Sequence, residues 1–150
     1  MSDFFMLEKD VIPCWYEIGF DELNYDYVRY PSDGVMSDAN YTWTTGTSTR
    51  AMMLKSFFSH LHEKLKGTGV KTSVDLFGMT TTVTSDMGIG QVLELALPYF
   101  DYISPMVYPS HYPKTWMGYA NPAEHPYEVI AISMTKGKER EQAWNIREGR

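Results

Sequence analysis

The sequence has 150 residues, with 13 basic and 19 acidic side chains and a formal net charge of -6 at pH 7. This length suits one domain with a real hydrophobic core. The acidic balance argues against a nucleic-acid or anionic-membrane surface, because both need clustered Lys and Arg. Apolar runs stay shorter than the ~20 residues of a membrane span, and residues 1–10 lack the basic start of a signal peptide. We therefore expect no nucleic-acid partner and no membrane span.

Seven segments alternate between helical and strand-like patterns. In chain order they are a helix over 5–18, a strand over 22–28, a helix over 50–66, a strand over 70–77, a helix over 89–97, a strand over 102–108 and a helix that begins near Pro126. The strands are short apolar runs bounded by Gly or Pro, which is typical of strands buried on both faces. The alternation predicts parallel βαβ units with right-handed crossovers.

Local signals set the limits of the helices. Ser48 or Thr49 can cap the helix over 50–66, and Gly67 ends it. Gly19 is a C′ candidate for the helix over 5–18. The apolar stripe expected on the helix over 50–66 consists of Met53, Phe57, Leu61 and Leu65. The last helix, which begins near Pro126, carries Val129, Ile130 and Ser133.

Three parallel strands do not close a barrel, so two architectures stay open. The strand spacing suits the roughly 30-residue unit of a (β/α)8 barrel. A small doubly wound sheet fits the same element order, but Gly88 and Gly90 form a lone Gly-x-Gly, which is a weak signal for phosphate binding. The Gly- and Thr-rich loop over 32–49 is long enough to be a functional loop after the first strand.

Two aspartates fall near the C-terminal ends of adjacent predicted strands, where (β/α) folds build active sites. These are Asp26 and Asp75. Because neighbouring strands lie ~4.8 Å apart, both side chains reach one pocket if both point inward. Paired carboxylates suit hydrolysis of a glycosidic bond, in which one acts as general acid and the other as nucleophile or as base for water. In the competing interpretation they cap a helix or pair with Arg29.

Residues after the third strand offer a second group of candidates. Tyr108, His111 and Tyr112 could stack on a sugar and donate hydrogen bonds to it, although each is also a common packing residue. Asp101 precedes that strand, at the opposite end of any barrel, and we expect a structural role for it. Since His60 and His62 stand two residues apart on a helix with no Cys or Glu cluster nearby, we expect no metal site and no cofactor.

Three motifs in series resemble one known family. They are Gly19-Phe-Asp-Glu-Leu-Asn-Tyr-Asp-Tyr-Val-Arg-Tyr-Pro-Ser-Asp-Gly34, Ser73-Val-Asp-Leu-Phe-Gly78 and Asp101-Tyr-Ile-Ser-Pro-Met-Val-Tyr-Pro-Ser-His-Tyr112. Together with 88–91 and 121–127, they resemble the signature of the bacterial putative glycosyl hydrolase domain family. The resemblance is strongest over residues 18–133.

The resemblance implies an α/β fold, a (β/α)8 TIM barrel, of which residues 1–150 would form a single incomplete domain with about strands four to six or seven and their helices. It places Asp26 on strand four, Asp75 on strand five and residues 108–112 in the strand-six loop, with Tyr27 and Arg29 as further substrate contacts. It also implies a secreted or cell-envelope protein.

The implied activity is hydrolysis of a polysaccharide or glycoconjugate. The alternative is a carbohydrate-binding or scaffolding barrel without turnover. In both cases the expected partner is a carbohydrate. The family domain is about twice as long as this chain, so we expect a fragment whose open sheet edges favour self-association.

Overall fold

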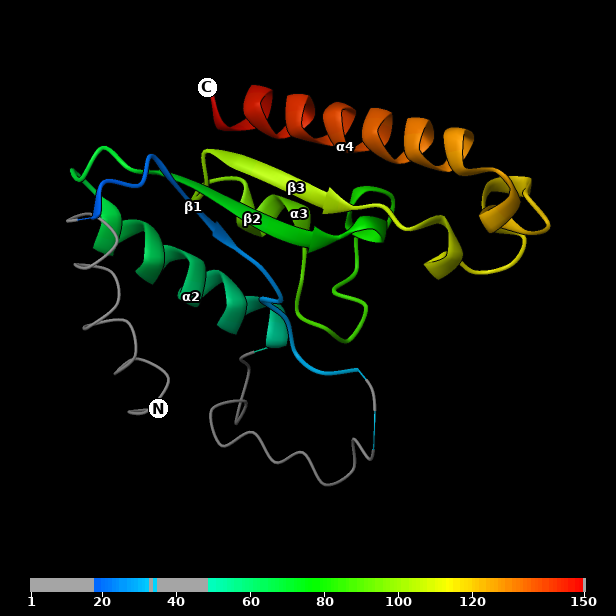
Figure 1. Ribbon diagram of the computed structural model, residues 1–150, viewed down its shortest axis with the longest axis horizontal. Helices are drawn as coiled ribbons and strands as arrows, with labels where there is room; N and C mark the ends of the chain where they lie inside the picture. Colours follow the sequence, from blue (N-terminus) through cyan, green and yellow to red (C-terminus); the bar gives the residue numbers. More distant parts are fainter. Residues whose placement is uncertain (1–17, 33, 35–48, 150) are drawn as a thin grey trace.

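The structure is a computed structural model that describes residues 18–32, 34 and 49–149 (Figure 1). The predicted helix over 5–18 and the loop over 32–49 lie almost entirely outside the described residues. Three strands form one parallel sheet in the order β1-β2-β3: β1 (Glu22–Tyr25), β2 (Lys71–Phe77) and β3 (Tyr102–Met106). The described helices are α2 (Arg50–Leu65), α3 (Leu93–Ala96) and α4 (Pro126–Glu148), with short 3-10 turns η2 (Gly78–Thr81), η3 (Pro109–His111), η4 (Trp116–Gly118) and η5 (Pro122–Glu124). The predicted α/β class is therefore confirmed.

All three predicted strands are present, but two of them end earlier than predicted. β1 stops at Tyr25 instead of reaching residue 28, because Tyr27 adopts a left-handed conformation with a φ of 57° that leaves the extended ladder. β3 stops at Met106, before the 3-10 turn that begins at Pro109. Each strand is thus followed by a loop at the carboxyl edge of the sheet.

The predicted limits of α2 are nearly correct, and its inward face is wider than the predicted stripe. Thr49 is the N-cap residue, since its Oγ1 accepts a hydrogen bond from the Met52 N–H at 3.3 Å. Leu61 and Leu65 are buried as predicted, and Met53 and Phe57 are partly buried against the same core. Leu54 and Phe58, which the predicted stripe did not include, are buried as well.

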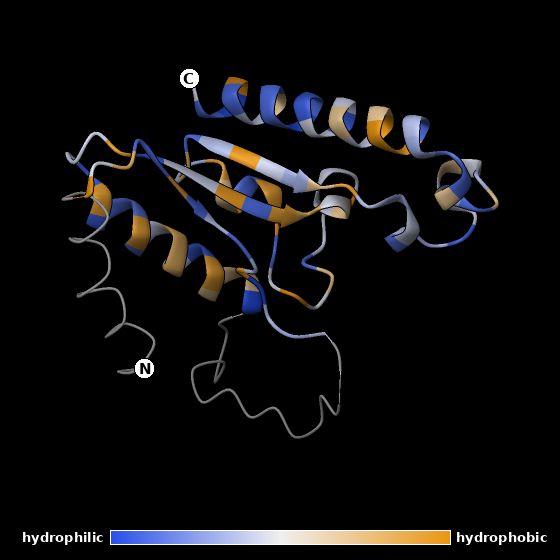
Figure 2. Cartoon of the chain, in the orientation of Figure 1, coloured by the Kyte–Doolittle hydropathy of each residue, from blue (hydrophilic) through white to orange (hydrophobic). Residues whose placement is uncertain are grey.

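The helix before β3 is shorter than predicted, and the last helix begins at Pro126 as predicted. The helix expected over 89–97 is confined to Leu93–Ala96, because Gly88 and Gly90 take positive φ angles in a turn before it. On α4, Val129 and Ser133 are buried and Ile130 is 45% exposed. Figure 2 shows why a stripe is hard to read there: the C-terminal half of α4 is mostly hydrophilic.

The two faces of the sheet differ in chemistry. Val74, Leu76 and Ile103 pack with α2 and α3 in the main hydrophobic core. Side chains alternate along a strand, so the next residues point to the other face. That face carries Asn24, Ser73, Asp75 and Ser104, which the register brings together as the pairs Asn24↔Ser73 and Asp75↔Ser104. The polar side chains are thus gathered opposite the core formed with α2 and α3.

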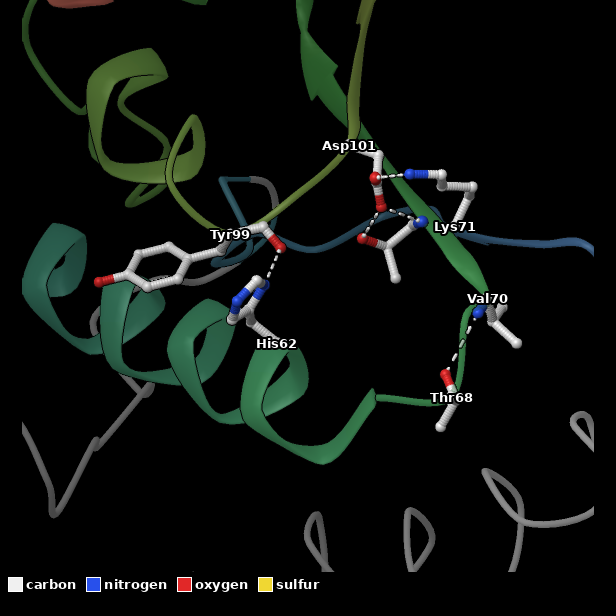
Figure 3. A network of polar contacts seen from close by, with 7 residues as sticks. His62, Thr68, Val70, Lys71, Tyr99 and Asp101 are labelled. Atoms are coloured by element: carbon white, nitrogen blue, oxygen red, sulfur yellow. Dashed lines mark hydrogen bonds and ion pairs between the residues drawn. The ribbon is translucent and has the colours of Figure 1, made fainter. Parts of the chain in front are cut away.

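Ion pairs and hydrogen bonds of two charged side chains, Asp101 and Arg140, connect elements that are far apart in the sequence. At the amino edge, Asp101 accepts hydrogen bonds from the Lys71 Nζ at 2.6 Å and from the Thr72 N–H at 2.9 Å (Figure 3). The structural role predicted for Asp101 is confirmed. At the other side, the Arg140 guanidinium joins α4 to Glu94 at 2.6 Å and to the Val83 carbonyl at 3.0 Å.

The part of the chain that the structure describes contains no helix long and apolar enough to cross a bilayer.

Candidate active site

A chain of hydrogen bonds on the polar face orients Asp75. The Ser73 hydroxyl donates to Asn24 Oδ1 at 2.8 Å, and Asn24 Nδ2 donates to Asp75 Oδ2 at 3.0 Å. These two bonds leave one orientation for the Asn24 amide, with its oxygen toward Ser73 and its nitrogen toward the carboxylate. Asp75 is half-buried on the central strand, so its carboxylate is held on one side and accessible on the other.

Asp26 follows β1 directly, at the carboxyl edge of the sheet. Its side chain is exposed, and its Oδ1 accepts a hydrogen bond from the Tyr27 N–H at 2.6 Å. That contact accompanies the left-handed conformation of Tyr27. Residues in such sparsely populated backbone conformations cluster at functional sites. The conformation of Tyr27 therefore favours a functional role for the segment that contains Asp26.

Tyr27 and Arg29 form a pair beside Asp26. The Arg29 guanidinium lies over the Tyr27 ring, 4.6 Å from its centroid, and its Nη2 donates to the Tyr27 hydroxyl at 3.2 Å. Arg29 also donates to the Tyr30 carbonyl and to the Ser32 hydroxyl, at 3.2 and 3.1 Å. Because the Tyr27 side chain is 65% exposed, the pair presents a flat, cationic surface to solvent.

Gln91 joins the chain after β1 to the last residue of β2. Its Oε1 accepts from the Phe77 N–H at 2.8 Å, and its Nε2 donates to the Val28 carbonyl at 2.9 Å. Sequence reasoning did not assign this residue a role, although it falls within the matching motif 88–91. The signal available was a polar residue between the apolar Ile89 and Val92, which indicates a buried amide with specific partners.

Three aromatic side chains gather at the ends of β2 and β3. The Phe77 and His111 rings stack with centroids 6.5 Å apart, and Tyr108 meets His111 edge-on at 5.2 Å. Tyr108 is 51% exposed, and His111 is exposed as well. Exposed rings at the carboxyl edge suit stacking on the apolar face of a sugar. The structure therefore brings Tyr108 and His111 together, with Phe77 as an unforeseen third member.

Tyr112 has a different environment from its predicted partners. It is 5% exposed and packs edge-on against Trp116, with centroids 4.7 Å apart. Its hydroxyl shares a hydrogen bond of 2.9 Å with the Ser133 hydroxyl on α4. Burial raises the pKa of Tyr112, and the hydrogen bond with Ser133 opposes that shift. With both ring and hydroxyl engaged in the interior, Tyr112 is a packing residue and is left out of the candidate site.

Neither a metal site nor a phosphate-binding turn is found in the described ranges. They contain no cluster of three or more His, Cys, Asp or Glu side chains. His62 Nδ1 is bonded to the Tyr99 carbonyl at 3.1 Å. Gly90 has a packing function, because a Cβ there would lie 2.9 Å from Leu54 and 3.0 Å from Tyr30.

The comparison with protein families identifies the chain. Residues 10–148 match the model of the putative glycosyl hydrolase domain family, and the chain belongs to that family. The resemblance of its three motifs is thereby confirmed, over a longer range than 18–133. No curated protein and no solved structure matches the chain.

Proposed function

We propose that this protein is a glycoside hydrolase that acts on a polysaccharide or glycoconjugate, with Asp26 and Asp75 as its catalytic carboxylates. The observation that carries the proposal is the position of these two residues. Asp75 lies on β2, and Asp26 directly follows the adjacent parallel strand β1, toward the same carboxyl edge of the sheet. The chain is a member of a family described as a glycosyl hydrolase domain. Active sites of (β/α) folds are built at that edge.

The proposed architecture is a segment of a (β/α)8 barrel that occupies residues 1–150. Sequential strand order supports it, as do the two crossover helices α2 and α3, which share one core on one face of the sheet. In a barrel all helices lie outside and the opposite face lines the interior. Asn24, Ser73 and Asp75 would then point into the barrel.

In the proposed reaction, one carboxyl group protonates the glycosidic oxygen while the second acts as nucleophile or as base for a water molecule. Both orders of roles agree with the contacts of Asp26 and Asp75. The aromatic group of Phe77, Tyr108 and His111 would stack on the sugar, and the Tyr27–Arg29 pair would bind its hydroxyls on the side of β1.

The test is hydrolysis of a panel of bacterial and plant polysaccharides, read as released reducing ends. It compares the 150-residue chain, a form extended on its N-terminal side, and Asp26→Asn and Asp75→Asn in whichever form is active. Each substitution keeps the shape of the side chain and removes its charge. We expect each to lower kcat by at least about 10³-fold, as loss of a catalytic group does.

Asp21→Asn is the matched control. Asp21 is exposed and lies at the amino edge, before β1, so its substitution should leave kcat unchanged. Folded wild-type protein that binds glycans but releases no product from any of them would refute the hydrolase proposal. That result would favour a carbohydrate-binding barrel.

A further inference from the structure

Gln91 is an amide enclosed in the interior with both of its ends engaged. The side chain is 0% exposed. Its carbonyl oxygen accepts from the Phe77 N–H at 2.8 Å, and its nitrogen donates to the Val28 carbonyl at 2.9 Å. Burying an amide is costly unless its polar atoms find partners, so the orientation of Gln91 is well determined by these bonds.

These bonds form beyond the point where the pairing of β1 with β2 stops. The last registered pair between β1 and β2 is Tyr25↔Val74. Beyond it, Gln91 joins Phe77, the last residue of β2, to Val28 in the chain after β1. The neighbouring backbone bond from the Tyr30 N–H to the Ile89 carbonyl, at 2.9 Å, connects the same turn to the chain after β1. The turn over 89–91 thus takes the place of further strand pairing.

Each of the two candidate catalytic aspartates lies the same number of residues before a residue that Gln91 contacts. Asp26 lies two residues before Val28, and Asp75 lies two residues before Phe77. We propose that Gln91 is a positioning residue that sets the separation between the Asp26 and Asp75 carboxylates. This inference rests on the proposed hydrolase function. The separation matters because retaining hydrolysis needs carboxyl groups ~5–5.5 Å apart, and inverting hydrolysis needs ~6.5–9.5 Å.

Two substitutions of similar size distinguish positioning from mere packing. Gln91→Met fills the same space and makes neither hydrogen bond. Gln91→Glu keeps an oxygen that accepts from Phe77, but when ionised it places a second oxygen against the Val28 carbonyl. When protonated, its O–H donates to Val28 and its C=O accepts from Phe77, so both original bonds return.

We expect Gln91→Met to lower kcat by about 10²-fold, as a misplacement of roughly 1 Å does, with KM changed by less than about threefold. Burial raises the pKa of a carboxyl group at this position. The kcat of Gln91→Glu, divided by that of the wild type at each pH, should therefore be lowered as strongly once the pH exceeds this raised pKa, and should recover as the pH falls below it. The ratio for Gln91→Met should stay independent of pH. A purely structural role would not produce this difference between two folded variants.

Hydrogen exchange supplies a readout that does not depend on activity. Gln91→Met should speed exchange of the Phe77 amide at least about tenfold, while the Leu76 amide, inside the ladder, stays protected. Folded variants with wild-type kcat, or with an unchanged Phe77 exchange rate, would overturn the role of Gln91 and leave the hydrolase proposal standing. A wild type without activity on any glycan would overturn the hydrolase proposal and the positioning role of Gln91 together, whatever the exchange data show.

Discussion

Asn24 Nδ2 donates a hydrogen bond of 3.0 Å to Asp75 Oδ2, and this bond links the first two strands on the polar face of the sheet. The Ser73 hydroxyl donates a hydrogen bond of 2.8 Å to Asn24 Oδ1 and thereby fixes the orientation of the Asn24 amide. A carboxylate that receives a hydrogen bond from a fixed donor has fewer rotamers to choose from. Asn24 therefore determines where the free oxygen of Asp75 points.

Asn24→Leu should lower kcat by about 10-fold and leave KM unchanged, because the charge-assisted bond to Asp75 is lost while the volume is kept. Steady-state kinetics of the active form checks this. The control is Ser73→Ala, which removes the supporting bond but leaves the Asn24–Asp75 contact, and should lower kcat by less than about threefold. Equal kinetics for Asn24→Leu and wild type would mean that Asp75 is oriented by other contacts.

Tyr108 and Tyr112 should respond in opposite ways to substitution. Tyr108→Ala removes an exposed ring and should raise KM by about 2–10-fold without changing the free energy of unfolding by more than about 0.5 kcal/mol. Tyr112→Phe removes the buried bond to Ser133 and should lower that free energy by about 1 kcal/mol with KM unchanged. Urea denaturation and kinetics of both variants check the pair. A raised KM in Tyr112→Phe would indicate that Tyr112 contributes to substrate binding, as predicted from the sequence.

Gly78 lies where the chain leaving β2 meets the chain leaving β3. A Cβ there would stand 2.5 Å from the Met106 carbonyl oxygen and 2.8 Å from the Val107 Cα, and backbone atoms cannot move aside as side chains do. Gly78→Ala should therefore lower the free energy of unfolding by about 2–3 kcal/mol.

Gly137→Ala is the matched control for this substitution. Its Cβ would meet the Thr81 Cγ2 methyl at 3.1 Å, and the residue lies inside α4, where Ala is favoured over Gly by about 1 kcal/mol. The two effects nearly cancel, and we expect a change below about 1 kcal/mol. Urea denaturation of both variants measures the difference. If Gly78→Ala changed the free energy of unfolding as little as Gly137→Ala does, the backbone around Gly78 would have to move to accommodate the added Cβ at little cost.

The Asp101 contacts predict a dependence of stability on pH. The hydrogen bond from Lys71, followed by that from the Thr72 N–H, lowers the pKa of Asp101 below its ordinary 3.8, and the same contact raises the pKa of Lys71 above 10.5. Asp101 therefore contributes stability above about pH 4, and this contribution is lost as the pH falls through the lower pKa of the folded state. The contribution of Lys71 is present below about pH 10 and is lost as the pH rises further.

Asp101→Ala should lower the free energy of unfolding at pH 7 by about 1 kcal/mol, mostly through the Thr72 bond, since the Lys71 pair is exposed and screened. The gap to wild type should be constant from about pH 5 to 9 and narrow below about pH 4. Thermal melts across this range check it. The control is Glu139→Ala, which removes an exposed pair with Lys136 and should have little effect at any pH. A gap that widens in acid would contradict the assigned contact.

Short-range signals explain which features could be predicted from the sequence. The order of strands and helices follows from local apolar runs and periodicity, and the Thr49 cap from a side chain three residues away from its donor. The burial of Leu54 and Phe58 on α2 was missed, because it depends on the neighbours that the helix meets. The shortness of α3 was missed, because it follows from the left-handed turn at Gly88 and Gly90. The positions of Asp26 and Asp75 near strand ends could be predicted from the same local patterns, and their catalytic role stays a prediction.

What the amino-acid sequence determined by itself was the α/β order, the family and the pair of strand-end carboxylates. Only the tertiary structure decided that Tyr112 turns into the interior and that Gln91 connects chain segments 63 and 14 residues away from it. The physical reason is that a buried polar group is defined by its partners, and partners far apart in the sequence are selected by strand register and packing, which no local pattern encodes.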